Sequence, residues 1–242
     1  ACILHGRLVL APHCQAFDVG LGCSGYVYGA WLASALMAIG LRRVLLLAGD
    51  TSSRMVDPND RSTALLFGDA GSATAFEYDP DAPPCYFNLG TDGKGANFLT
   101  VPGGGFRPVD PQATDANYLH MDGSSVFGFT IGTVPKLIKA VLEQANVSKD
   151  DVDLFALHQA NRFILRHIGK KLAFSTEQLP INIEQFGNTS SASIPLLLCT
   201  NSAEQITTSP TTVVMAGFGV GLSWGAALFR TVQLQCASVI SV

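Results

Sequence analysis

The chain has 242 residues, with 15 Lys and Arg against 19 Asp and Glu, which gives a formal net charge of -4. This length suits one large domain or two halves, and it exceeds that of a small domain held together by disulfides or a metal ion. The lack of a basic excess argues against a general nucleic-acid binder, because nothing would neutralise a run of phosphates. Charged residues make up only 14% of the chain, against about 25% in an average soluble domain, so we expect part of the surface to be covered by another subunit.

The cysteines and the apolar runs bound the class of protein further. The six cysteines include no C-x-x-C pair and no Cys/His cluster with zinc spacing, so neither a disulfide framework nor a metal site is expected. Residues 23–41 carry no charge and are long enough to cross a bilayer, but glycines and serines interrupt them, and we interpret them as a buried helix. No basic segment followed by a small-residue cleavage site opens the chain, which favours a cytoplasmic protein without a membrane partner.

The first part of the chain predicts alternating strands and helices. A strand is expected at 15–20, a helix after Cys23, and a second strand at 43–50 whose continuous apolar run is typical of a strand buried on both faces. A glycine-rich turn then leads into a strand that ends near Phe76. From 80 to about 122 the chain is rich in Gly, Pro and Asp and predicts loops with short strands.

The second part repeats this alternation. Two helices are expected from apolar residues at helical spacing, namely Leu137, Val141 and Ala145 in the first and Ile164, Ile168 and Leu172 in the second. The other expected elements are strands at 153–157, near 181, at 211–216 and at 223–230, and a helix at 194–198. The last strand follows a glycine-rich turn like the one before Phe76, which we interpret as a sign of internal duplication.

Three side chains stand where predicted strands give way to helices. Cys23 lies between glycines before a long helix, where the orphan amides of the helix would stabilise a thiolate and the sharp turn would expose the sulfur. His158 follows a predicted buried strand, and Asn188 lies in a Gly-Asn turn before another helix. Each alone has an ordinary structural explanation, as a packed thiol, a core histidine or a helix cap. Because all three stand at strand ends, one shared site is expected.

A cysteine, a histidine and an asparagine together suit acyl transfer through a thioester. Two neutral donors, an imidazole N–H and an amide N–H, can hold a thioester oxygen as it becomes an enolate, whereas an Asp would repel that charge. Backbone amides near Cys23 and in the turn 219–221 can hold a second oxygen. The set therefore suits carbon–carbon bond formation as well as hydrolysis.

Five motifs occur in order along the chain: Gly-Cys-Ser-Gly, Phe-Gly-Asp-Ala-Gly, His-Gln-Ala-Asn, Gly-Asn-Thr-Ser-Ser-Ala-Ser and Gly-Leu-Ser-Trp-Gly-Ala-Ala. With them the sequence resembles the beta-ketoacyl-acyl carrier protein synthase III family over nearly its whole length. The resemblance implies an α/β fold of thiolase-like type, with duplicated α-β-α-β-α layers in an N-terminal half at 1–122 and a C-terminal half at 123–242. It also implies a homodimer that takes an acyl group from acyl-CoA and condenses it with malonyl-acyl carrier protein or malonyl-CoA. No cofactor is expected beyond acyl-CoA as substrate.

By motif position, Cys23 would be the acylated nucleophile, and His158 and Asn188 would assist decarboxylation and hold the enolate. The resemblance places Gly219 and Val220 in the oxyanion loop and Asn161, Phe218 and Ser124 at the substrate. A cationic stripe, defined as Arg162, Arg166, Lys170 and Lys171, would dock the phosphates of CoA or an acidic carrier protein. The ordinary alternative for this stripe is a solvated helix face.

Three departures from the family pattern bear on these expectations. The family's proteins begin with roughly another quarter of chain, so we expect the first half of the fold to be incomplete at its N-terminus unless another segment completes its sheet. Val220 stands where the family's final loop has a central glycine, and Ser24 and Tyr26 replace a common Ala and Phe. These changes indicate a divergent acyl specificity.

Two other functions stay open from the sequence. A papain-like thiol hydrolase also carries Cys, His and Asn in this order, although its usual Cys-Gly-Ser-Cys-Trp signature and its disulfides are missing here. A protein of this fold that binds acyl chains without turning them over is the second alternative. Acylation of Cys23 would distinguish both from a condensing enzyme.

Overall fold

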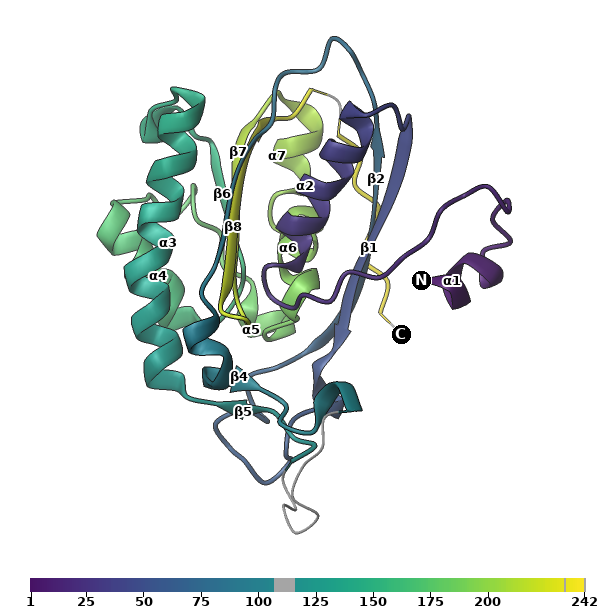
Figure 1. The fold of residues 1–242 in the computed structure, drawn as a ribbon. Helices are drawn as coiled ribbons and strands as arrows, with labels where there is room; N and C mark the ends of the chain where they lie inside the picture. Colours follow the sequence, from purple (N-terminus) through teal and green to yellow (C-terminus); the bar gives the residue numbers. More distant parts are fainter. Residues whose placement is uncertain (107–115, 233, 242) are drawn as a thin grey trace.

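The computed structural model describes residues 1–106, 116–232 and 234–241. Its centre is a four-stranded sheet in the order β3 (Tyr86–Thr91), β8 (Ser223–Arg230), β7 (Thr212–Gly219) and β6 (Leu154–Leu157). The β6–β7 pair is parallel and the other two pairs are antiparallel. Figure 1 shows α3 (Gly123–Ala145) and α4 (Arg162–Leu172) on one face of this sheet. The predicted α/β fold class is confirmed.

The opposite face of this sheet is covered by a second layer of helices, and a second sheet lies beyond them. The helices are α2 (Gly25–Ala38), α6 (Ser193–Cys199) and α7 (Ala203–Thr208), and the outer sheet pairs β1 (Arg43–Thr51) with β2 (Asp69–Glu77) antiparallel (Figure 1). One apolar cluster lies between the four-stranded sheet and α3 and α4, and another lies between that sheet, α2, α6 and β1. The strands of the central sheet therefore have helices on both sides.

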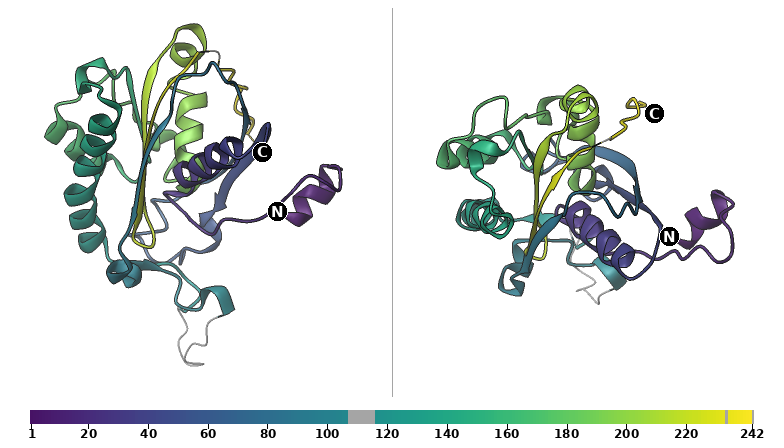
Figure 2. Two further views of the ribbon diagram at one scale, coloured as in Figure 1. Left: turned by 45° about the horizontal axis from the view of Figure 1, so that its top comes forward. Right: turned by 90° about the horizontal axis from the view of Figure 1, so that it is seen from above.

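The remaining elements are short. A small sheet pairs β4 (Leu99–Thr100) with β5 (His120–Met121), and Figure 2 shows α1 (Cys2–Arg7) standing apart from the layers. The others are α5 (Ile183–Phe186) and the 3-10 turns η1 (Ser52–Arg54), η2 (Gly93–Phe98), η3 (Gly104–Phe106), η4 (Lys149–Asp151) and η5 (Ser190–Ala192). The predicted loops and short strands of 80–122 are confirmed for the described residues, and β3 from this segment pairs with β8 of the second half.

Two of the predicted strands are wrong. Residues 15–20 form no strand, and Phe17 and Val19 are 56% and 47% exposed, because no strand pairs with this segment among the described residues. Near Ile181 the chain is irregular and passes directly into α5. The expected burial of β1 on both faces is also wrong, since its side chains alternate between the helix layer and solvent and leave Leu45 50% exposed.

Two helices of the molecule, α2 and α3, are apolar over most of their length. The uncharged run that follows Cys23 forms α2, whose buried side chains pack between the two sheets, as expected for a core helix. Among the described residues, α3 is the one helix long and apolar enough to cross a membrane. Its apolar face packs on the central sheet through residues such as Val134, Ile138 and Val141, which is the arrangement of a core helix.

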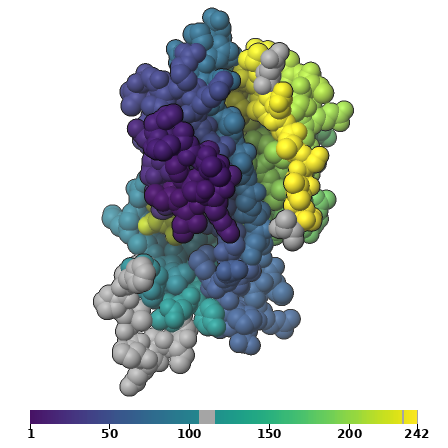
Figure 3. Space-filling model, turned by 90° about the vertical axis from the view of Figure 1, so that its right-hand side faces the viewer, coloured from purple at the N-terminus to yellow at the C-terminus, as the bar shows by residue number. Residues whose placement is uncertain are grey.

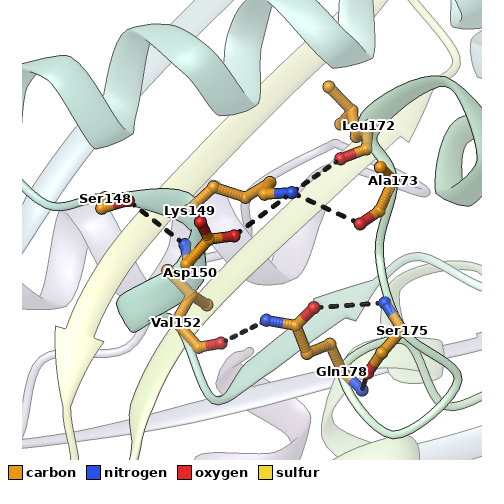
Figure 4. Close-up of polar contacts among 8 residues, drawn as sticks. All are labelled: Ser148, Lys149, Asp150, Val152, Leu172, Ala173, Ser175 and Gln178. Atoms are coloured by element: carbon orange, nitrogen blue, oxygen red, sulfur yellow. Dashed lines mark hydrogen bonds and ion pairs between the residues drawn. The ribbon is translucent and has the colours of Figure 1, made fainter.

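Side-chain hydrogen bonds join the segment before β6 to the C-terminal end of α4 and the residues after it (Figure 4). Lys149 donates from Nζ to the carbonyl oxygens of Leu172 and Ala173, at 3.4 and 3.3 Å, at the C-terminal end of α4. Gln178 donates from Nε2 to the Val152 carbonyl at 2.8 Å, just before β6. These contacts tie the far ends of β6 and α4 together, and the other ends of the same two elements carry functional candidates.

The two chain termini lie on the side of the molecule away from α3 and α4. Figure 3 views this side and shows α1 in purple and the last residues of the chain in yellow. Leu234 and Cys236, after β8, pack against the second apolar cluster. The C-terminal residues therefore contribute to the layer around α6.

Candidate active site

Cys23 lies in the turn before α2, as predicted, and its surroundings are built from small residues. Ser24 is the N-cap of α2, and a Cβ added at Gly217 would lie 2.9 Å from the Cys23 carbonyl oxygen. A Cβ at Gly219 would lie 2.7 Å from Cys23 Cβ and 2.8 Å from its Sγ. Glycines at these positions therefore let β7 approach the thiol closely.

The expectation of an exposed sulfur is wrong. Cys23 is only 7% exposed, and its Sγ lies 3.9 Å from the Ser190 Oγ. Burial raises the pKa of the Cys23 thiol, and the Asp50 carboxylate acts in the same direction. The Ser190 hydroxyl and the backbone of Val220 and of Cys23 itself lower the pKa without cancelling the burial. The resting site therefore favours the protonated thiol.

His158 comes directly after β6 and is 1% exposed. Its Nδ1 lies 2.6 Å from the Ser193 Oγ, and its ring meets the Phe218 ring edge to face at 5.5 Å. Burial lowers the pKa of the imidazole to about 4, against the opposing influence of the Ser190 backbone and the Asp50 carboxylate. The ring is therefore neutral near pH 7 and can donate one N–H.

The Ser193 hydroxyl lies beside the His158 ring on its Nδ1 side. Ser193 Oγ accepts a hydrogen bond from the Gln159 backbone N–H at 3.4 Å and lies 2.6 Å from Nδ1. A hydroxyl can donate one hydrogen bond and accept two, so its contact with Nδ1 suits either tautomer of the ring. The contact holds the orientation of the imidazole in the site.

Asn188 follows the turn at Gly187, whose φ of 67° is a conformation that favours glycine. Its backbone donates to the Leu66 carbonyl at 2.9 Å and accepts from the Gly68 N–H at 3.0 Å, so the turn is joined to the segment before β2. The side-chain Oδ1 accepts from the Ser190 N–H at 2.9 Å, and Nδ2 donates to the Ala160 carbonyl at 3.3 Å. These bonds orient the amide with its acceptor oxygen already occupied.

The three predicted catalytic side chains line a single cavity of about 40 Å³. Phe218, Gly219 and Asn161 are also part of its wall, together with apolar side chains. The structure thus brings together residues 23, 158 and 188 from separate parts of the chain, as the sequence predicted. A second cavity of about 500 Å³ shares four lining residues with the first, namely Met121, Val126, Asn161 and Ile164.

The predicted substrate residues lie along these two cavities. Asn161 lines both, and as N-cap of α4 its Oδ1 accepts from the Ile164 N–H at 2.8 Å, which leaves its NH₂ group for a ligand. Ser124 lines only the outer cavity, where its hydroxyl donates to Asp122 at 2.8 Å. Phe218 is 2% exposed and lines only the inner one. Asn161 therefore lies in the wall shared by the two cavities, and Ser124 lies at the outer one.

The cationic stripe divides into two parts in the structure. All four of its side chains are exposed on α4. Arg162, at the start of the helix beside the outer cavity, forms an ion pair with Glu184, and Lys171 donates to the Ile131 carbonyl at 2.8 Å. Lys170 and Lys171 stand at the far end of the helix, roughly 12 to 14 Å away along its axis at 1.5 Å per residue. Only Arg162 and Arg166 lie in the half of α4 that begins at the cavity.

Three residues near the site carry no predicted role, yet two of them contact catalytic side chains and the third acts on them through its charge. Ser193 bonds His158, Ser190 contacts Cys23, and Asp50 influences the pKa of both Cys23 and His158. Asp50 is itself held by Ser191, whose N–H and hydroxyl donate to its Oδ2 at 3.0 and 2.6 Å. The run of serines in the Gly-Asn-Thr-Ser-Ser-Ala-Ser motif was the sequence signal for this serine-rich wall.

Comparisons with known proteins agree with this site. Residues 17–93 match the family model for 3-oxoacyl-[acyl-carrier-protein] synthase III, and residues 142–231 match the model for its C-terminal part. The beta-ketoacyl-[acyl-carrier-protein] synthase III of Clostridium tetani is 33% identical over 95% of this chain and 72% of its own length, and that of Lactobacillus helveticus is 37% identical over 91% and 69%.

Solved structures give the same answer. A 3-oxoacyl-(acyl-carrier protein) synthase from Burkholderia xenovorans LB400 is 45% identical, with a TM-score of 0.93 over 98% of this chain and 70% of its own. The priming beta-ketosynthase of the R1128 polyketide pathway is 28% identical, with a TM-score of 0.82 over 94% of this chain and 69% of its own. The thiolase-like fold is thereby confirmed, and it is not that of a papain-like hydrolase. The chain belongs to the beta-ketoacyl-acyl carrier protein synthase III family, and it is a condensing acyltransferase of fatty acid biosynthesis.

Proposed function

We propose that Cys23 takes an acyl group from acyl-CoA and passes it to a malonyl thioester. In the first stage the thiol loses its proton, and its sulfur attacks the acyl carbonyl carbon. The tetrahedral intermediate collapses with departure of CoA, which takes up a proton, and an acyl thioester remains on Cys23. The observation that supports this stage is the placement of the backbone of Val220 and of Cys23 at the sulfur, where the same N–H groups can hold the carbonyl oxygen.

In the second stage His158 and Asn188 hold the malonyl thioester. Loss of CO₂ leaves an enolate, whose oxygen accepts hydrogen bonds from His158 Nε2 and Asn188 Nδ2. The enolate carbon then attacks the acyl carbon on Cys23, and the C–S bond breaks to release a 3-oxoacyl product. The departing Cys23 thiolate takes up a proton from solvent, which regenerates the thiol. A neutral imidazole suits this donor role, because burial lowers its pKa to about 4. The chemistry asks for no cofactor or metal of the protein.

The two cavities provide the route for the substrate arm. We propose that the amide-bearing arm of CoA or of the carrier protein passes the outer cavity and contacts Asn161 and Ser124, which reach that space from the start of α4 and of α3. Arg162 and Arg166 then meet the phosphates or an acidic helix at the opening. Lys170 and Lys171 would serve only a partner large enough to extend along α4, which is a carrier protein rather than CoA.

We also propose that two copies of the chain form a homodimer. Apolar side chains stand exposed on the segment before Cys23 and on the loop before β2, with Phe17 at 56% and Leu65 at 81%. Burying such surface against a second copy would explain the low charge content. Sedimentation at micromolar concentration should give twice the mass of one chain, and a monomeric mass would contradict the proposal.

All six cysteines are free thiols, which supports the cytoplasm as the compartment.

The experiment that tests this function is intact-mass spectrometry after brief incubation with a panel of acyl-CoAs. The protein should gain the mass of one acyl group, and Cys23→Ala should gain none. Addition of malonyl-carrier protein or malonyl-CoA should then remove the adduct and release a 3-oxoacyl product. An adduct that forms but does not condense with either malonyl donor would contradict the second stage. Absence of any adduct on folded protein would contradict the assignment of Cys23.

A further inference from the structure

Two buried hydroxyl groups connect Ser24, the N-cap of α2 and the residue after Cys23, with the loop that follows β7. The Ser24 Oγ lies 2.6 Å from the Ser223 Oγ, and the Ser223 Oγ lies 2.6 Å from the Val220 carbonyl oxygen. Ser24 is 0% and Ser223 is 1% exposed. Polar groups this deeply buried are stable only when their hydrogen-bonding capacity is used. The two short contacts form a chain that runs from the residue after Cys23 to the loop.

The direction of both hydrogen bonds follows from the chemistry of the last acceptor. A carbonyl oxygen only accepts, so Ser223 donates its proton to Val220. Since that proton is committed, the Ser223 Oγ must accept the proton of Ser24. The order is therefore Ser24 to Ser223 to Val220, and each serine depends on the next for its orientation.

The hydrogen bonds of Ser24 and Ser223 restrain the loop 220–222, which its own backbone restrains little. Gly221 has a φ of 133°, a conformation that glycine adopts readily and other residues rarely do, so its own backbone restricts the loop little. On its far side the loop is anchored by backbone bonds between Leu222 and Asp92, at 3.0 and 2.9 Å. On its near side Gly219 is packed against Cys23. The Ser223 hydroxyl supplies the restraint between these two anchors.

We propose that Ser24 and Ser223 are positioning residues, whose hydroxyl chain keeps Val220 turned so that its N–H faces the Cys23 sulfur and the acyl oxygen formed on it. The inference rests on the proposed function, in which Cys23 is acylated. It assigns a role to Ser24, one of the positions where this chain departs from the common family pattern. It also explains how a valine can occupy the middle of a glycine-rich loop while its backbone still serves the thiol.

The test compares Ser223→Ala, Ser223→Thr and Ser24→Ala with a matched control, Ser34→Ala, which removes a hydroxyl that donates at 3.0 Å to the Ala30 carbonyl within α2. Two readouts are needed: the rate of Cys23 acylation by acyl-CoA, and the pH dependence of Cys23 alkylation by iodoacetamide, followed by peptide mass. Loss of one buried hydrogen bond to the loop should slow acylation at saturating acyl-CoA by about tenfold with little change in KM.

Ser223→Ala should also move the alkylation profile of Cys23 to higher pH, because the Val220 N–H no longer faces the sulfur. Ser223→Thr, which keeps the hydroxyl, should restore both readouts, Ser24→Ala should have a smaller effect in the same direction, and Ser34→Ala should match the wild type. A wild-type rate and profile in Ser223→Ala would overturn the proposal, and so would a Ser223→Thr variant as impaired as the alanine. Alkylation requires no acyl donor, so the profile still tests the positioning role if acylation itself is never observed.

Discussion

The two sides of the catalytic cavity are built in different ways. On the thiol side the groups that face the sulfur belong mainly to the backbone, and glycines bring the chain segments together. On the opposite side the donors are the side chains of His158 and Asn188, each oriented by a hydrogen bond from the serine-rich segment. The thiol side therefore depends on how closely backbones can approach, whereas the other side depends on which side chains are present.

The largest effect should come from filling the contact between β7 and the thiol. Gly219→Ala places a Cβ 2.7 Å from Cys23 Cβ and 2.8 Å from its Sγ, closer than such atoms approach. The thiol or the loop must shift, and a displacement of about 1 Å at the reacting atoms can cost about 10²-fold in rate. We expect acylation of Cys23 to slow by about that factor, measured by the rate of adduct formation in intact-mass spectra.

The matched control is Gly128→Ala in α3, where an added Cβ meets nothing within 4 Å. This variant should acylate at the wild-type rate and gain up to about 1 kcal/mol of stability from the better helix former. If Gly219→Ala acylates as fast as Gly128→Ala, the thiol side does not depend on close backbone approach.

The side of the cavity that is built from side chains should make the stability of the protein depend on pH. The pKa of His158 falls from 6.5 when exposed to about 4 in the folded protein, chiefly through burial. The unfolded chain thus binds more protons between these values, so stability is lost as the pH falls from 6.5 to 4. The difference corresponds to about 3 kcal/mol. Urea unfolding at pH 7 and pH 4 measures how much the free energy of unfolding decreases with pH. This decrease should be about 3 kcal/mol smaller in His158→Gln than in the wild type. Equal decreases would contradict the buried neutral imidazole.

A smaller effect should appear at Gly22, next to the thiol. A Cβ there would lie 2.9 Å from Val220 Cγ1 and 3.3 Å from the Ser190 Oγ. Gly22→Ala should destabilise the protein by about 1–3 kcal/mol through overpacking. In a Val220→Gly background, which removes the closer contact, the same change should cost less by about 1 kcal/mol. Strict additivity in a double-mutant cycle by urea unfolding would show that the two side chains do not compete for this space.

The three catalytic candidates could be predicted from the sequence because each lies in a local motif, although only His158 directly follows a strand in the structure. Cys23, His158 and Asn188 were expected to share one site, and one cavity contains them all. The bonds that orient them could not be predicted in this way. Ser193 lies 35 residues from His158, and Ser24 and Ser223 are 199 residues apart, so only the folded chain brings them together.

The fold shows the same division between local pattern and tertiary environment. The strand that became β6 is buried on both sides, as its apolar run predicted. The run in β1 is equally apolar, yet only one of its faces packs against helices, because burial depends on what lies across the sheet and not on the strand itself. Residues 15–20 were predicted to form a strand, but no other strand pairs with them among the described residues.

The most direct test of the account is whether the two sides of the cavity serve separable stages. Asn188→Asp keeps the size of the side chain and replaces the amide donor by a carboxylate that repels an enolate. Acyl-CoA should load Cys23 of this variant within a few-fold of the wild-type rate, and a chase with malonyl-carrier protein should remove the adduct about 10² to 10³ times more slowly. Asn146→Asp, at the exposed end of α3, should behave as the wild type in both steps. A folded Asn188→Asp that condenses at the wild-type rate, or that cannot be acylated at all, would contradict the division between the two sides.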